Sequence, residues 1–98
     1  MKIIQVKKLE DCFDGSTIYE YKFDDFWTYE QIKRLTRFGE LNYYKDFPRP
    51  FFKLNGQQGM QIKGVEGENS FTVFFPRNGK EEIQKILEGH FKTNHNKY

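Results

Sequence analysis

The chain has 98 residues, with 16 basic and 14 acidic side chains that give a formal net charge of +2. This length permits one hydrophobic core and no second domain, so we expect a single domain over residues 1–92 and a frayed polar tail over residues 93–98. The interspersed charges form no basic stripe, which argues against a nucleic-acid binder. Apolar runs are too short to span a membrane, and the single cysteine, Cys12, allows no internal disulfide, so the sequence predicts a cytoplasmic protein.

The first two predicted elements form an antiparallel hairpin. Residues 3–9 are rich in β-branched side chains, and residues 17–23 alternate aromatic with mostly polar positions. Asp14-Gly15 between them is a strong turn signal.

A helix is predicted from Thr28 to Gly39. Thr28 is a good N-cap, and Gln31 can complete a capping box three residues later. Trp27 and Ile32 stand at the positions of a hydrophobic staple, and Gly39 is expected to end the helix in a left-handed conformation.

Residues 40–76 predict four short strands, at 41–44, 51–54, 60–65 and 71–75. Asn55-Gly56 is typical of a hairpin turn, and Gly64 inside a strand indicates a bulge. These features together predict an antiparallel meander.

The last predicted element is a helix that Asn78 can cap. Its apolar face is formed at helical spacing by Ile83, Ile86, Leu87, His90 and Phe91. The element order β-β-α-β-β-β-β-α predicts an α+β fold in which two helices pack on one face of a single antiparallel or mixed sheet. Nothing else in the chain would cover the other face.

The chain offers little for catalysis or metal binding. Cys12 lies in an acidic turn, where the carboxylates of Asp11 and Asp14 would raise rather than lower a thiol pKa. His90 and His95 are five residues apart, a spacing that turns two helical side chains away from each other. We therefore expect no catalytic residue, no metal site and no cofactor.

One segment combines aromatic rings, a guanidinium and a loop stiffened by prolines. Such a combination can stack bases or hold an anionic or proline-rich partner. The candidate binding residues in this segment are Tyr43, Tyr44, Arg49 and Phe51.

Two hypotheses follow. In the favoured one, the protein is a binding or interaction module that forms a homodimer through its open sheet face, serves a partner protein or holds a small ligand. In the other, it is a small enzyme, and Cys12 and His90 converge within hydrogen-bond reach at a sheet edge. Weak nucleic-acid binding is a lesser variant of the first, and no membrane partner is expected.

Overall fold

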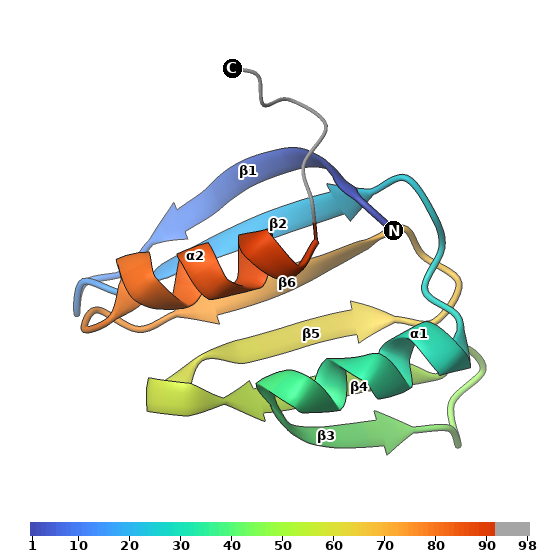
Figure 1. The fold of residues 1–98 in the computed structure, drawn as a ribbon. Coiled ribbons are helices and arrows are strands. Elements are labelled where there is room, and N and C mark those ends of the chain that lie inside the picture. Colours follow the sequence, from blue (N-terminus) through green and yellow to red (C-terminus); the bar gives the residue numbers. More distant parts are fainter. Residues whose placement is uncertain (92–98) are drawn as a thin grey trace.

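Strands of alternating apolar and polar residues pair into one six-stranded antiparallel sheet in the computed structural model, which describes residues 1–91 (Figure 1). The strand order across the sheet is β1-β2-β6-β5-β4-β3. The elements in chain order are β1 Ile3–Asp11, β2 Thr17–Phe23, α1 Tyr29–Lys33, the 3-10 helix η1 Arg34–Phe38, β3 Gly39–Tyr44, β4 Phe51–Gly56, the 3-10 turn η2 Gln57–Gly59, β5 Gln61–Val65, β6 Ser70–Phe75 and α2 Lys80–His90. The predicted α+β fold and its element order are confirmed.

Both helical segments lie on the same face of the sheet. In Figure 1, α2 crosses in front of β2 and β6, while α1 and η1 lie in front of β4. The strand residues that are buried on that face and build the core are Ile3, Tyr21, Phe23, Phe52, Leu54, Ile62, Phe71, Val73 and Phe75. The opposite face carries no helix among residues 1–91.

The core is built largely from aromatic rings, each of which buries a large area. Trp27 stacks on Phe71 with ring centroids 5.2 Å apart, and the edge of Phe23 meets Trp27 at 5.1 Å. Phe91, just after α2, packs against Phe23 at 5.0 Å. The rings seen in the sequence therefore serve mainly to fill the space between sheet and helices.

Tyr21 anchors α2 to the sheet. Its hydroxyl donates to the Glu88 carboxylate at 2.8 Å and accepts from the Gln84 amide at 3.3 Å. Burial and the neighbouring Glu88 charge raise the pKa of Tyr21 well above its usual value.

The start of the first helix is as predicted, but its end differs. The N–H of Gln31 donates to Thr28 Oγ1 at 3.2 Å, and Trp27 and Ile32 are buried. The α-helix ends at Lys33 and continues as η1. The prediction for Gly39 is wrong: its angles (φ 159°, ψ −155°) are not those of a left-handed cap, and it is the first residue of β3.

Two other predictions about glycines, the hairpin turn at Gly56 and the bulge at Gly64, are also wrong. Asn55 and Gly56 lie inside β4, and η2 makes the turn to β5 instead. No register shift accompanies Gly64, so the predicted bulge is absent. A Cβ at Gly64 would lie 2.4 Å from Cζ of Phe52, so glycine is needed there to admit a core ring.

The second helix also begins differently from the prediction. Gly79, in a left-handed conformation (φ 82°), is its N-cap in place of Asn78. Of the predicted apolar face, Ile83, Leu87 and Phe91 are buried, whereas Ile86 and His90 are exposed.

The predicted frayed tail lies outside the described residues. No helix within residues 1–91 has the length and apolar character required to cross a membrane.

Candidate binding surface

The face of the sheet opposite the helices is formed by the alternate residues of the same strands. The strand registers align its central row across all six strands, and in spatial order this row is Lys7, Glu20, Thr72, Lys63, Lys53 and Asn42. Lys53 and Lys63 are direct cross-strand partners. Neither takes part in the ion pairs found in residues 1–91, which are Lys8–Asp11 and Arg49–Glu68. Two adjacent cations without a carboxylate partner therefore lie at the middle of the β4–β5 pair.

A groove of about 610 Å³ lies beside these lysines on the same face. We call it the far-face groove, and it is lined by Phe47, Pro48, Arg49, Phe51, Lys63, Gly64, Val65, Glu68, Ser70, Phe71 and Thr72. Its volume falls in the range of about 300–1,000 Å³ common for ligand sites. Its lining is mainly apolar.

An aromatic wall of three rings borders the far-face groove: Phe47 and Phe51 line the groove, and Tyr44 stacks on Phe51 behind them. Tyr44 and Phe51 are cross-strand partners and stack with centroids 4.6 Å apart and planes inclined by 18°. Phe47 packs on Phe51 at 5.0 Å, yet 52% of its surface is exposed. Because these rings touch one another and lie outside the core, they form a continuous apolar patch on the surface.

Backbone hydrogen bonds join the loops at the end of the sheet where the far-face groove lies. The N–H of Glu66 donates to the carbonyl of Pro50 at 2.9 Å. The N–H of Trp27 donates to the carbonyl of Glu68, and the N–H of Gly67 donates to that of Trp27, both at 2.8 Å. Three connections distant in sequence (β2–α1, β3–β4 and β5–β6) are thus fixed to one another, which positions the loop residues of the groove.

Arg49 and Glu68 form an ion pair at the rim of the far-face groove. Their Nη2 and Oε2 atoms are 2.6 Å apart, with 59% and 46% of the two side chains exposed. An exposed pair of this kind adds at most about 1 kcal/mol to stability. Arg49 is therefore held in place by Glu68 and remains accessible to a ligand.

The structure places three of the four predicted binding residues together. Tyr44, Arg49 and Phe51 lie on the uncovered face, but Tyr43 points to the opposite face, as alternation in β3 requires. There its hydroxyl donates to the Glu66 carboxylate, and its ring lies 5.0 Å from that of Tyr29. The hydrogen bond to Glu66 raises the pKa of Tyr43 to about 12.

The sequence analysis missed the groove residues contributed by other strands. Lys63 and Val65 belong to β5, which was predicted as an ordinary meander strand, and Glu68 belongs to a predicted turn. Lys53, beside the groove, belongs to β4 and was also missed. Alternation within β4 and β5 could have assigned Lys53 and Lys63 to the polar face, but their pairing depends on strand register.

Cys12 and His90 do not converge. Cys12 lies in the β1–β2 turn, where its N–H donates to the carbonyl of Ser16. His90 is the last residue of α2 and contacts Arg37 and Phe38. Figure 1 shows the β1–β2 turn near the start of α2, at the opposite end of the helix from His90.

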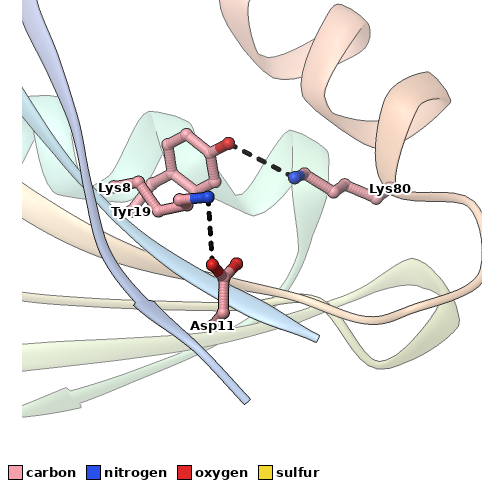
Figure 2. Close-up of polar contacts among 4 residues, drawn as sticks. All are labelled: Lys8, Asp11, Tyr19 and Lys80. Atoms are coloured by element: carbon pink, nitrogen blue, oxygen red, sulfur yellow. Dashed lines mark hydrogen bonds and ion pairs between the residues drawn. The ribbon is translucent and has the colours of Figure 1, made fainter. Parts of the chain in front are cut away.

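Three charged side chains near the β1–β2 turn, those of Lys8, Asp11 and Lys80, have partners within the chain. Figure 2 shows Asp11 bonded to Lys8 at 3.1 Å and the Tyr19 hydroxyl accepting from Lys80 at 3.2 Å. Across residues 1–91, no three His, Cys, Asp or Glu side chains gather in a way that could hold a metal ion. In comparisons with known proteins, no family model, curated protein or solved structure matches this chain.

Proposed function

We propose that this protein is a binding module that holds a segment of a partner protein in the far-face groove, and that the segment carries acidic and apolar side chains. The observation that carries the proposal is the apolar groove on the uncovered face, with Lys53 and Lys63 beside it. The single cysteine suggests that the module acts in a reducing compartment, which we take to be the cytoplasm.

The aromatic wall supports an apolar anchor in the bound segment. Phe47, Phe51 and Tyr44 pack on one another without entering the core. Aromatic side chains at an open groove are the usual anchors of protein interfaces, because each removes a large area from water on binding. An aliphatic or aromatic side chain of the partner would fill the groove between this wall and Val65.

The lysines support acidic residues next to that anchor. Like charges directly opposite on adjacent strands destabilise a sheet. Lys53 and Lys63 have this arrangement, and a carboxylate from a partner would offset their repulsion. Glu20 interrupts the cations of the central row, whereas a nucleic-acid strand is neutralised by a continuous basic track, so a short acidic peptide beside Lys53 and Lys63 fits the surface better than a phosphate chain.

Selection of peptides from a random phage-displayed library tests this proposal, with the full chain as bait. We expect enriched peptides to combine acidic residues with one large apolar residue. A synthetic peptide of the enriched sequence, measured by fluorescence anisotropy, should bind Phe47→Ser about tenfold or more weakly, because an aromatic anchor is lost. The double variant Lys53→Glu, Lys63→Glu should bind the peptide about tenfold more weakly than the wild type. This difference in affinity should shrink at high salt, which screens the charges.

Matched controls lie elsewhere on the surface. Phe13 is fully exposed in the β1–β2 turn, and Lys85 is exposed on α2. Phe13→Ser and Lys85→Glu should leave peptide affinity unchanged. Equal losses in the control and groove variants would contradict the proposal.

Two measurements separate this partner from the alternatives. Light scattering that gives a dimer for the wild type and a folded monomer for Phe47→Ser would make a second copy the occupant and overturn the proposal. Tighter binding of a single-stranded oligonucleotide than of any selected peptide would assign the groove to nucleic acid instead.

A further inference from the structure

A second cavity lies on the helical side of the molecule, away from the far-face groove. It has a volume of about 180 Å³ and is lined by Met1, Gln31, Arg34, Leu35, His90 and Phe91. It lies where α1 and η1 meet the end of α2. Leu35 and Phe91 are buried and form its apolar base, whereas Gln31, Arg34 and His90 supply polar groups.

Arg37 does not line this cavity itself, but its guanidinium contacts His90 at the cavity's edge. Its Nη1 atom lies 3.0 Å from Nδ1 of His90. A guanidinium can only donate, so Nδ1 accepts and the proton of the neutral imidazole resides on Nε2. Gln31, Arg34, Arg37 and His90 therefore all offer N–H donors in one small region.

The two arginines at this cavity have no ion-pair partner among residues 1–91. Neither Arg34 nor Arg37 belongs to the ion pairs of the described chain. The nearest acidic residue of α2, Glu88, is hydrogen-bonded to Tyr21 and Gln84. Partial burial and the Arg37 guanidinium lower the pKa of His90, which favours the neutral imidazole.

We propose that this cavity binds the phosphate group of a small phosphorylated molecule through Arg34, Arg37 and His90. A phosphate ester carries a charge of about −1.5 to −2 at neutral pH, which matches two guanidinium groups next to a neutral imidazole. Its oxygens accept hydrogen bonds, and arginine donates to phosphate in a bidentate geometry. The small volume suits this group rather than a large ligand.

Titration of the 15N-labelled full chain with inorganic phosphate at neutral pH and constant ionic strength tests the site. We expect the amide signals of Leu35, Arg37, His90 and Phe91 to shift and saturate at millimolar phosphate. Arg34→Gln and Arg37→Gln should each weaken binding about tenfold, because each removes a charge-assisted contact. Both arginines are exposed, so these variants should stay folded.

Lys85→Gln is the matched control, because it removes an exposed cation from α2, the helix that ends at His90, without touching the cavity. It should change phosphate affinity by less than about twofold. Bound phosphate should also raise the pKa of His90, since a nearby anion favours the charged imidazole. Of the charged groups in residues 1–91, Arg37 is the one that acts on this ring in the free protein.

Comparator anions distinguish the sources of the phosphate. Tighter binding of glycerol phosphate than of inorganic phosphate would assign the site to phosphate esters, and equal binding would assign it to free phosphate. Acetate should bind more weakly than either. Equal shifts with acetate and phosphate, or unchanged affinity in both arginine variants, would overturn the proposal, whatever the result at the far-face groove.

Discussion

The two faces of the sheet use aromatic residues in different ways, although alternate positions of the same strands supply both. On the helical side, Phe52 and Phe71 are almost fully buried and touch Trp27. On the other side, Phe51 and Tyr44 stack at the surface. A high content of aromatic residues therefore does not by itself indicate a binding surface, because neighbouring phenylalanines in β4 have opposite environments.

Truncation of neighbouring phenylalanines in β4 should show the largest difference between the faces. We expect Phe52→Ala to lower the free energy of unfolding by about 3–5 kcal/mol, because it removes a buried ring and leaves a cavity. Phe51→Ala should cost about 1 kcal/mol, since its side chain is only partly buried. Urea denaturation, followed by the fluorescence of the single Trp27, measures both. Similar losses would contradict the assignment of the two faces.

Gly64 tests how tightly the helical side is packed. A Cβ at this position would meet Phe52 and, at 3.1 Å, the Cβ of Phe71, so Gly64→Ala should cost about 1–3 kcal/mol. Gly89→Ala is the control, because a Cβ in that part of α2 has open space around it. This change should stabilise the protein by about 0.5–1 kcal/mol. An unchanged free energy of unfolding for Gly64→Ala would contradict the close packing of Phe52 and Phe71 around this residue.

Replacement of Tyr21 should give the smallest of the three changes in the free energy of unfolding at neutral pH, and the size of this change should depend on pH. Its pKa is raised in the folded state, so the unfolded chain loses this proton first as the pH rises above about 10. The contribution of Tyr21 to the free energy of unfolding should therefore be constant below pH 10 and fall above it, by at most about 1.4 kcal/mol per pH unit. Tyr21→Phe should cost about 1 kcal/mol at pH 7 and reduce that slope. An identical slope in the variant would contradict this account.

Local signals in the sequence predicted the elements well where a few neighbouring residues decide the structure. The Thr28 cap with Trp27 and Ile32 fixed the start of α1, and alternation predicted β2. Predictions failed where the deciding contact is distant in the chain. Gly39 approaches the backbone carbonyl of Asn55, and Gly64 makes room for Phe52.

The candidate surface was predicted in part for the same reason. The segment with Tyr44, Arg49 and Phe51 could be found because its residues are close in sequence. Lys63 comes from another strand, and only the registers place it beside Lys53. The Arg37–His90 contact spans 53 residues and has no local signal.

The sequence by itself determined the α+β class, the order of the elements and which residues in each strand are apolar, because these depend on periodicity and capping within short stretches. Tertiary structure decided the strand order, the pairing of Lys53 with Lys63, the far-face groove and the cavity between η1 and α2. These features arise from strand register and from the packing of helices on one face, which bring residues together independently of their distance along the chain.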